Sequence, residues 1–330
     1  NWSIAKATAS VSVKTNLVYN GSEQECLESS VGVTINSGSK ATDAGSYTLK
    51  ATPKNNYEWS DGGTDLREFN WSIAKATASA PTLYDTTETY DGYKHYIDVS
   101  GGSEGTIYYA TSSSKNGTYS SWSSTKPSLT NAGVLYVKAY TKGNDNYEDS
   151  SVAGPKSITI NKKTLQYSLD VGNYTYDGNS HNAGIETGWN ATYMEYSGTW
   201  NATAAGEYIY QVSLKDENNY QWSDGTSNYK SYKWYIYRAN TSSASSSDKT
   251  YNGSSQTGVT GSYVNWSGTT SATNVGNYTA YATPDSNHAW PDGSTTNKSY
   301  DWKINKRTVQ TLNWVVLFFT FQKVLKPLYM

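Results

Sequence analysis

Short stretches in which apolar and polar residues alternate recur along the chain, each after a turn that contains glycine. After the turn at 43–46, the residues Tyr47, Leu49 and Ala51 fall on one face. Similar alternation follows related turns at 131–133, 204–206 and 274–276. A period of two residues is typical of a strand with one buried face. The pattern predicts four half-buried strands in an all-β chain, because no segment shows sustained helical periodicity.

A second set of alternating stretches carries tryptophan and is predicted to close each structural unit. In the first of them, Phe69, Trp71 and Ile73 share one face. Trp71, Trp234 and Trp302 each follow, by 12 residues, the tryptophan of a Trp-Ser/Pro-Asp-Gly turn, and those earlier tryptophans are Trp59, Trp222 and Trp290. The constant spacing predicts a hairpin that pairs the two stretches. We interpret both sets of tryptophans as structural anchors of a core.

A Tyr-Asn/Asp-Gly triplet opens each unit, and its tyrosines are Tyr19, Tyr90, Tyr176 and Tyr251. Asn-Gly and Asp-Gly favour turns that need a positive φ, so each triplet predicts a hairpin turn whose tyrosine anchors the preceding strand. Five residues after these tyrosines stand Gln24, His95, His181 and Gln256. The exchange of Gln for His at one position indicates a hydrogen-bonding role rather than a titrating one.

The residues 1–10 and 70–79 are identical, which indicates tandem duplication of a structural unit. The order of the recurring features predicts the following divisions: 1–7 as the orphan closing strand of a truncated module, 8–76, 77–163, 164–239 and 240–307 as four repeat modules of which 77–163 is divergent, and 308–330 as an atypical apolar tail. Each module is predicted to be a small β-sandwich of immunoglobulin-like type or a β-grasp-like sheet, and the array is expected to be monomeric.

The tail differs from the rest of the chain. From Leu312 on it lacks Gly, Ser, Asp and Glu, and it holds Phe318, Phe319 and Phe321. The apolar stretch at 315–321 is far shorter than the ~20 residues of a membrane span, so no clear span is predicted. A membrane anchor, the start of a fifth module and a frameshifted or otherwise non-native end are the alternatives, and the last is favoured.

Aromatic rings are expected to fill most of the core, since the chain has 31 Tyr and 12 Trp. The formal net charge is only −2, which offers no electrostatic footprint for nucleic acid. Cys26 is the single cysteine, so neither an internal disulfide nor a cysteine-based metal site can form. No cofactor and no metal ion are predicted.

No catalytic constellation is recognisable, and the chain is not predicted to be an enzyme. The histidines His95, His181 and His288 fall in different modules, and none has a metal-ligand spacing. The oxygen-rich stretch at 144–149 lacks the spacing of an EF-hand, so a solvated loop is favoured over a calcium site. An isopeptide bond from the closing-strand lysines Lys75, Lys162 and Lys306 is disfavoured, because no asparagine follows a matching pattern.

Aromatic residues that do not recur between modules are the predicted ligand contacts, if the chain binds a glycan. They are Trp122, Trp189, Trp200 and Trp266. The recurring tryptophans are better explained as core, because the chain has few aliphatic side chains to fill an interior.

The combination of Tyr-Asp/Asn-Gly, the Asp-Ala-Gly-Ser-Tyr turn at 43–47, Trp-Ser-Asp-Gly at 59–62 and Trp-Ser-Ile-Ala-Lys-Ala at 71–76 resembles the YDG-type and MBG-type repeats of large bacterial surface proteins and their immunoglobulin-like relatives. The resemblance covers about residues 1–307. It implies an extracellular, surface-attached stalk, spacer or adhesin without an active site, whose partners are host or matrix glycans or proteins. The alternative is a set of glycan-binding modules within a secreted carbohydrate-active enzyme.

Overall fold

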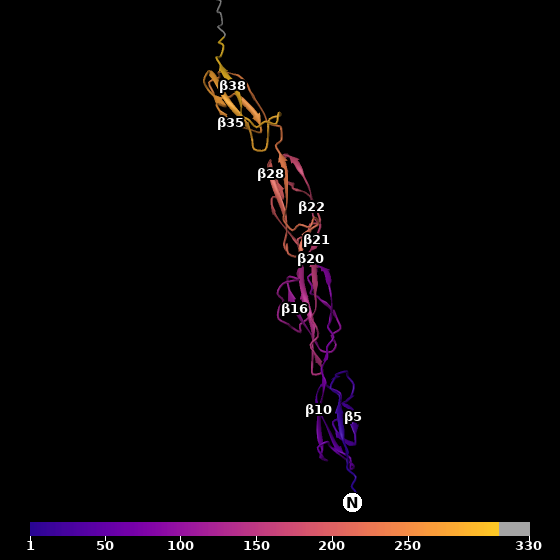
Figure 1. Cartoon of the computed structure of the whole chain (residues 1–330). Coiled ribbons are helices and arrows are strands. Elements are labelled where there is room, and N and C mark those ends of the chain that lie inside the picture. Colours follow the sequence, from indigo (N-terminus) through magenta and orange to yellow (C-terminus); the bar gives the residue numbers. More distant parts are fainter. Residues whose placement is uncertain (310–330) are drawn as a thin grey trace, which may run out of the picture. The chain divides into compact units, whose positions relative to one another are not determined.

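The computed structural model describes residues 1–309, and every regular element in that range is a β-strand (Figure 1). The all-β prediction is confirmed. The chain forms two compact units: the first contains 1–167 and 214–228, and the second contains 168–213 and the described residues from 229 on. The predicted apolar tail lies almost entirely outside the described residues. No helix of the described range is long and apolar enough to span a membrane.

A four-stranded sheet with one strand order occurs four times, and we call the part of the chain around each sheet a repeat. In the first repeat the order is β3 (Leu17–Val18), β10 (Arg67–Ala74), β8 (Gly45–Pro53) and β6 (Val33–Ser37). The β10 strand is antiparallel to β8 and parallel to β3. The corresponding strands are β13 (Thr86–Thr89), β20 (Ala153–Asn161), β18 (Gly133–Lys142) and β16 (Thr106–Ser112) in the second repeat; β23 (Asn173–Thr175), β30 (Lys230–Tyr237), β28 (Gly206–Leu214) and β26 (Met194–Gly198) in the third; and β32 (Lys249–Thr250), β38 (Lys298–Asn305), β37 (Gly276–Pro284) and β35 (Val264–Gly268) in the fourth.

Two-stranded pairs accompany each sheet. In the first repeat these are the antiparallel pairs β2 (Ser10–Val13) with β5 (Leu27–Val31) and β4 (Gln24–Glu25) with β7 (Lys40–Ala41), and the parallel pair β1 (Ala7–Thr8) with β9 (Tyr57–Glu58). The corresponding pairs are β12 (Thr82–Tyr84) with β15 (Asp98–Ser100), β14 (His95–Tyr96) with β17 (Ser128–Leu129), β11 (Ala76–Thr77) with β19 (Tyr147–Glu148), β22 (Ser168–Val171) with β25 (Gly184–Thr187), β24 (His181–Asn182) with β27 (Asn201–Ala202), β21 (Lys163–Leu165) with β29 (Tyr220–Trp222), β31 (Ser243–Ser246) with β34 (Val259–Ser262), and β33 (Gln256–Thr257) with β36 (Ser271–Ala272).

The core of the first repeat lies between the four-stranded sheet and the β2–β5 pair. Leu49 from β8 and Trp71 and Ile73 from β10 are buried together with Cys26, and Val11 of β2 packs against them. The alternation at positions 47–51 and 69–73 therefore produces the expected buried face. Because two β layers enclose the core, the repeat is a small sandwich.

The central tryptophan of the closing strand is buried in three repeats and bonds to the same turn in each. Its indole Nε1–H donates to a carbonyl oxygen of the turn between the β6-type and β7-type strands: Trp71 to Gly38 (2.9 Å), Trp234 to Thr199 (2.9 Å) and Trp302 to Thr269 (2.8 Å). In the divergent second repeat, Ile158 occupies the equivalent register position and is fully buried. In that repeat an apolar side chain without a hydrogen-bond donor therefore fills the place of the tryptophan in the core.

The predicted hairpin between the Trp-Ser/Pro-Asp-Gly turn and the closing strand is wrong. β10 pairs with β8 and β3, whereas β9, which leads into Trp59, pairs in parallel with β1. Trp59 is buried at the turn itself, where its Nε1–H donates to the Asp65 carbonyl oxygen at 2.8 Å. The constant spacing of 12 residues reflects a turn of constant length and not a strand pair.

Residues 1–6 form no strand, and Trp2 and Ile4 are 90% and 89% exposed. Strand pairing begins at Ala7 in β1. The same decapeptide therefore contains buried residues at Trp71 and Ile73 and exposed ones at Trp2 and Ile4. Local sequence does not decide burial here, because a closing strand needs a sheet beside it.

Candidate functional site

The Tyr-Asn/Asp-Gly turns contain a hydrogen-bonded pair that differs between two types of repeat. Where the turn has Asp, a histidine ring bonds to it: His95 Nε2 to Asp91 Oδ1 and His181 Nε2 to Asp177 Oδ1, both at 2.9 Å. Where the turn has Asn, the glutamine amide donates to a backbone carbonyl oxygen instead, as Gln24 does to Val18 at 2.9 Å and Gln256 does to Thr250 at 3.1 Å. The histidines at this position thus support the turn.

The hydrogen bonds at the Asp177 turn predict that the stability of the protein depends on pH in the acid range. Hydrogen bonds from the Asn179 backbone N–H, from the Asn179 side chain and from His181 lower the pKa of Asp177 from 3.8 to about 2. Because the folded pKa is depressed, the stabilisation is present above pH 3.8 and is lost as the pH falls through 2. Asp177→Asn keeps the turn, since Asn20 and Asn252 make the same backbone hydrogen bond. The thermal midpoint of the wild type should fall more steeply between pH 4 and pH 2 than that of the variant. Parallel curves would contradict this assignment.

Within residues 1–309, no group of three or more His, Cys, Asp or Glu side chains could hold a metal ion. Asn144, Asn146 and Asp149 of the stretch at 144–149 accept hydrogen bonds from the protein with their side-chain oxygens. Asn144 Oδ1 accepts from the backbone N–H groups of Asn146 and Tyr147, and Asp149 accepts from Gly143 and Lys142. The solvated loop stays a prediction.

An asparagine side chain reaches from each of three loops to a glycine turn of the preceding repeat. The backbone N–H groups of Ala44, Ala132 and Ala205 donate to Asn146 Oδ1 (2.8 Å), Asn219 Oδ1 (2.7 Å) and Asn287 Oδ1 (2.9 Å). The paired residues are 102, 87 and 82 positions apart in the sequence. Each pair lies within one of the two compact units. We call this recurring contact the junction.

The loop that carries the junction asparagine is held by its own side chains. An Asn or Asp two or three residues earlier accepts backbone N–H bonds within the loop, as Asn144 does from Asn146, Asp216 from Asn219 and Asp285 from Asn287. Such side-chain turns are typical of Asn and Asp. They fix the direction of the asparagine before it meets the neighbouring repeat.

The residue after each junction asparagine places an aromatic ring edge-on against the tyrosine of the preceding Tyr-Asn/Asp-Gly turn. The ring centroids are 5.3 Å apart for Tyr19 and Tyr147, 5.4 Å for Tyr90 and Tyr220, and 5.1 Å for Tyr176 and His288, at interplanar angles of 80°, 84° and 82°. Edge-to-face geometry is favoured by the charge distribution of aromatic rings. Three of the four tyrosines predicted as anchors, Tyr19, Tyr90 and Tyr176, therefore contact the next repeat.

A basic side chain at the end of the closing strand completes the junction. Lys75 Nζ donates to the Asn144 carbonyl oxygen (2.8 Å), Lys162 Nζ to that of Glu217 (2.6 Å) and Arg238 Nε to that of Ser286 (3.0 Å). The linker after the closing strand then pairs in parallel with the loop that carries the junction asparagine. The pairs are β11 with β19, β21 with β29, and the single bridge between Ala239 and His288. The recurring lysines considered for an isopeptide bond thus include two that bond to junction loops.

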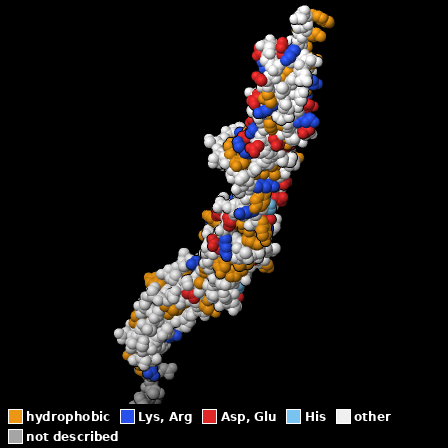
Figure 2. Space-filling model, turned by 90° about the horizontal axis from the view of Figure 1, so that it is seen from below, with side chains coloured by type: hydrophobic (Ala, Val, Ile, Leu, Met, Phe, Trp, Pro, Cys, Tyr) orange, Lys and Arg blue, Asp and Glu red, His pale blue; other side chains and the backbone are white. Residues whose placement is uncertain are grey.

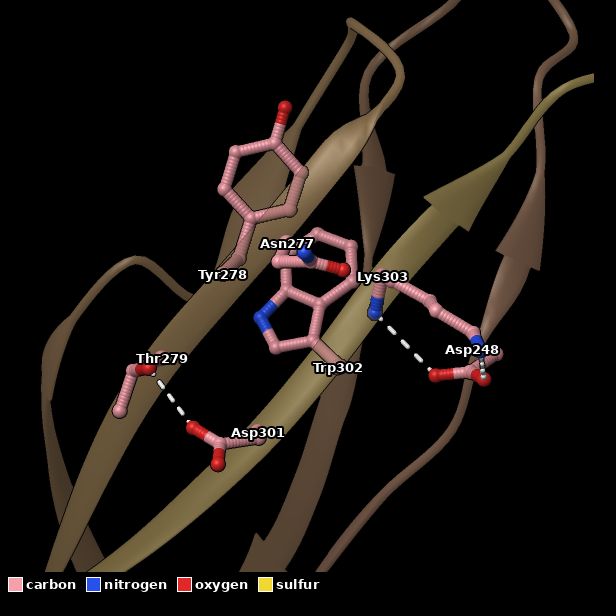
Figure 3. A pocket seen from close by; sticks show the side chains of 7 residues that line it. All are labelled: Asp248, Asn277, Tyr278, Thr279, Asp301, Trp302 and Lys303. Carbon is pink, nitrogen blue, oxygen red and sulfur yellow. Dashed lines mark hydrogen bonds and ion pairs between the residues drawn. The ribbon is translucent and has the colours of Figure 1, made fainter.

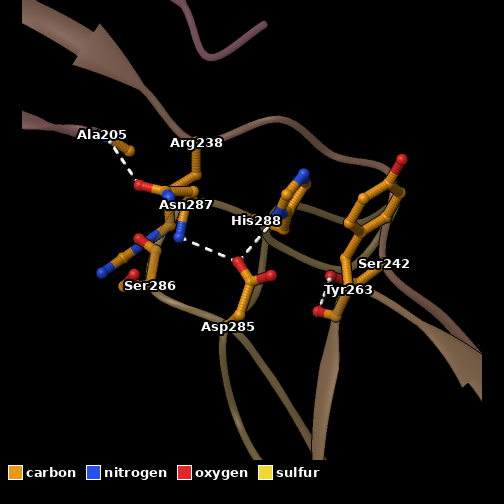
Figure 4. A network of polar contacts seen from close by, with 8 residues as sticks. All are labelled: Ala205, Arg238, Ser242, Tyr263, Asp285, Ser286, Asn287 and His288. Carbon is orange, nitrogen blue, oxygen red and sulfur yellow. Dashed lines mark hydrogen bonds and ion pairs between the residues drawn. The ribbon is translucent and has the colours of Figure 1, made fainter. Parts of the chain in front are cut away.

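The junction in the second compact unit contains a buried histidine (Figure 4). His288 Nδ1 lies 2.6 Å from Asp285 Oδ1, and its ring stacks on Tyr263 with centroids 4.0 Å apart. Asn287 points the other way, toward Ala205 (Figure 4). One loop therefore uses adjacent residues to contact two different segments.

The glycine turn that receives the asparagine is linked to the core. Tyr47 lies against Trp71, with ring centroids 4.9 Å apart, and its hydroxyl donates to the Asp43 carbonyl oxygen at 2.7 Å. Tyr208 and Tyr278 make the same two contacts in the third and fourth repeats. Packing in the core thereby positions the N–H group that the junction uses.

A shallow hollow lies over this Tyr–Trp pair in the fourth repeat (Figure 3), and a similar one lies over Tyr47 and Trp71 in the first. The polar side chains at its rim are paired, because Thr279 donates to Asp301 at 2.7 Å and Lys303 lies 3.5 Å from Asp248. Trp302 is only 2% exposed. The hollow therefore offers no open indole face to a ligand.

Two of the four predicted ligand contacts, Trp189 and Trp200, lie in one aromatic group, and Trp122 and Trp266 lie elsewhere. Trp122 is 41% exposed and meets the edge of Tyr140, whereas Trp266 packs against the core of the fourth repeat. Trp189 and Trp200 lie in one aromatic group of the third repeat, in contact with Tyr196 and Tyr210 respectively. Tyr196, which sequence reasoning missed, is 61% exposed.

Charged side chains of both signs are interspersed on the face shown in Figure 2, without a basic or acidic patch. This distribution agrees with the formal net charge of −2. It provides no focused field for a polyanionic partner on that face.

Neither a family model nor a curated protein matches the chain. Among solved structures, the chain is similar to immunoglobulin domains 1–5 of Sidekick-1, at 11% identity and a TM-score of 0.21, over 92% of this chain and 78% of that one. It is similar to domains 1–6 of the surface layer protein SbsC at 11% identity and a TM-score of 0.19, over 86% and 46%. A third similar structure is SGBP-B of a Bacteroides ovatus mixed-linkage glucan utilization locus, in complex with a mixed-linkage heptasaccharide, at 13% identity and a TM-score of 0.17, over 69% and 71%. The similar structures are tandem immunoglobulin-like arrays and bacterial surface proteins.

Proposed function

We propose that the chain is a non-catalytic repeat region of an extracellular surface protein, where it serves as stalk, spacer or adhesin. Its repeats correspond to the predicted modules 8–76, 77–163, 164–239 and 240–307, of the YDG or MBG type. The observation that carries the proposal is the junction, because the same asparagine, aromatic ring and basic side chain join successive repeats three times. A chain in which the same contacts join successive repeats is suited to carrying another part of a protein.

Surface display tests the proposed function. The chain is fused between a cell-wall anchor and an epitope on an encapsulated bacterium, and antibody binding to the epitope is measured by flow cytometry. We expect strong labelling with the chain and weak labelling when the epitope is fused directly to the anchor. Equal labelling of the two fusions would refute the spacer role.

Loss of one junction asparagine should be measurable in the protein itself. Asn219 is 5% exposed, accepts from Ala132 and donates to Asp216 and Asn131. Asn219→Ala leaves the Ala132 N–H without its acceptor and should lower the free energy of unfolding by about 2 kcal/mol. Urea unfolding and hydrogen exchange of the Ala132 amide measure the effect.

The first repeat provides a matched control for that variant. Asn56 is the equivalent residue and is exposed. Asn56→Ala should therefore change the unfolding free energy of the monomer by less than about 0.5 kcal/mol. Equal effects of the two substitutions would show that the asparagine acts within its own loop and not across the junction.

Glycan binding is a second candidate function, favoured by the aromatic group of the third repeat. Tyr196 is 61% exposed and lies 5.7 Å from Trp189 and 5.8 Å from Tyr210, measured between ring centroids. Exposed rings stack on the apolar faces of pyranose sugars. Affinity electrophoresis of the full chain in gels that contain soluble β-glucan or xylan tests this function. Retardation that Tyr196→Ala abolishes and Tyr93→Ala retains would support it, since Tyr93 is exposed elsewhere, at 74%. Unretarded migration in both gels would count against it.

A further inference from the structure

One edge strand of the fourth repeat lacks the features by which proteins protect such strands. Among residues 1–309, β35 pairs with β37 alone and stands at the edge of its sheet. Its register with β37 is continuous from Val264 to Gly268, and its sequence, Val-Asn-Trp-Ser-Gly, has neither a charged residue nor a proline. Bulges, charges, prolines and covering segments are the usual means of keeping an edge strand from pairing with another chain.

The equivalent edge strand of each other repeat has one of these features. β6 has a bulge between Ile35 and Ser37, and β26 carries the exposed Glu195. β16 is covered by a segment of its own repeat, which bridges it at Tyr109. Of these four strands, all within the described range, β35 therefore has the least protection against an added strand.

The second repeat shows what such an edge accepts. Tyr109 and Ser123 exchange both of their backbone hydrogen bonds in an antiparallel bridge, with the Tyr109 N–H donating at 2.7 Å and the Ser123 N–H at 2.9 Å. The Ser120 N–H also donates to the Thr111 carbonyl oxygen at 2.8 Å. The covering segment at 119–125 reads Tyr-Ser-Ser-Trp-Ser-Ser-Thr and has no charged residue. An extended, uncharged, serine-rich segment therefore fits this edge.

Trp266 holds in β35 the position that Tyr109 holds in β16. Tyr109 lies opposite Ala139 of β18, and Trp266 lies opposite Ala282 of β37. The two alanines are at the same position counted from the first residue of each strand. The covered edge of the second repeat is therefore a direct guide to what the edge of the fourth repeat can bind.

The backbone of Trp266 faces away from β37. Three residues before it, the Tyr263 carbonyl oxygen accepts a hydrogen bond from the Asp285 N–H at 3.0 Å. Bonded and non-bonded pairs alternate in an antiparallel ladder, so positions 263, 265 and 267 bond to the partner strand and the N–H and C=O of Trp266 point outward. The exposed side chains beside it, Asn265 and Ser267, are neutral and do not select a charged partner.

We propose that β35 binds an extended, uncharged segment of a partner protein, rich in serine and threonine, which adds to the sheet as an antiparallel strand through the backbone N–H and C=O of Trp266. Main-chain hydrogen bonds supply the affinity in this mode of recognition, and the side chains of alternate residues supply the specificity. The inference rests on the proposed function, since it names the partner chemistry of the adhesin role, but it uses a sheet edge and no junction residue.

A capped peptide with the sequence of 117–125 tests the proposal on the full chain, by NMR titration of the isotope-labelled protein. We expect the backbone amide of Trp266 to shift saturably up to about 2 mM peptide, a range suited to one untethered strand. N-methylation of the peptide residue that corresponds to Ser123 removes the bridging donor and should weaken binding at least about fivefold. N-methylation at the Trp122 position should leave binding unchanged, because the bridge uses the N–H and C=O of Ser123.

Two substitutions at Trp266 separate recognition of the backbone from recognition of the ring. Trp266→Pro removes the outward N–H, which an edge strand tolerates, and should weaken peptide binding at least about fivefold. Trp266→Val keeps the N–H and a residue that favours strands, so it should bind the peptide like the wild type. Circular dichroism confirms that both variants are folded, and the two N-methylated peptides test the same bond on the wild type.

Three results would each overturn the proposal: no shift of the β35 amides, equal binding of the two N-methylated peptides, and equal loss of binding in the two Trp266 variants. Self-association of the chain through β35 without peptide binding, measured by sedimentation velocity, would make a second copy the occupant and would also overturn it. A chain that binds no peptide but still raises epitope labelling in the display experiment refutes this inference and leaves the spacer role in place.

Discussion

Replacing Trp71 with Ala should lower the free energy of unfolding of the first repeat by about 3–5 kcal/mol. The side chain is 5% exposed, packs in the cluster with Leu49 and Ile73, and donates its indole N–H to the Gly38 carbonyl oxygen at 2.9 Å. The substitution creates a cavity and also leaves that carbonyl without its donor. Since small domains have only about 5–15 kcal/mol of stability, this loss is a large part of the total. Urea unfolding followed by circular dichroism, with limited proteolysis to locate the unfolded segment, measures it.

The chain supplies its own control for this substitution. Trp2 stands in the same ten-residue sequence as Trp71 but is 90% exposed. Trp2→Ala should change stability by less than about 0.5 kcal/mol. Comparable losses from the two variants would mean that the decapeptide stabilises the protein locally, and the core role of Trp71 would be wrong.

Replacing Gly38 with Ala should cost about 3 kcal/mol, for two separate physical reasons. Gly38 has φ +76°, in the left-handed region that residues with a Cβ avoid. An added Cβ would lie 2.0 Å from the Thr48 carbonyl oxygen, and a backbone atom in a paired strand cannot move aside cheaply. Thermal and urea unfolding of the variant should show a clear loss of stability.

Gly21 separates the two causes, because it has the same φ of +76° but its nearest neighbour is the Tyr19 hydroxyl at 4.0 Å. Gly21→Ala should therefore cost only about 1 kcal/mol, the part due to φ. If Gly21→Ala lowers the stability as much as Gly38→Ala does, the close approach of the β8 backbone contributes nothing to the loss of stability at Gly38. Gly198 and Gly268 stand at the equivalent of Gly38 and also have positive φ, which extends the comparison to other repeats.

The predicted and observed strands agree best where one short segment decides the outcome. Alternation at 47–51 and 69–73 became the buried faces of β8 and β10. The Tyr-Asn/Asp-Gly triplets became turns with glycine at positive φ, at Gly21, Gly92, Gly178 and Gly253. They are not the predicted hairpin turns, because the strand before the first triplet, β3, pairs with β10 and the strand after it, β4, pairs with β7. The exchange between Gln and His at one position was interpretable because both side chains make hydrogen bonds, Gln24 to the strand before the turn and His181 to the turn itself.

The predicted hairpin between the Trp59 turn and the strand of Trp71 was wrong because spacing alone cannot identify a strand pair. The spacing between Trp59 and Trp71 is constant, but a constant spacing does not distinguish a strand pair from a turn that leads into a strand. Trp59 bonds to Asp65 within its turn, and the partner of the strand before it is the linker residue pair Ala7–Thr8. A parallel pair with a segment some 50 residues earlier has no local signature in one sequence.

Periodicity, glycine-containing turns and duplication are properties of short segments, so they are enough to predict an all-β tandem array, the positions of its turns and the tryptophans of its core. The contacts of the recurring Asn-Tyr/His pair cannot be predicted in this way. Asn146, Asn219 and Asn287 bond to turns 82 to 102 residues away, and the choice of that partner depends on how folded repeats meet. The burial of Trp71 and the exposure of Trp2 in identical sequences have the same cause: a side chain is buried by the surface that faces it, and that surface belongs to another part of the chain.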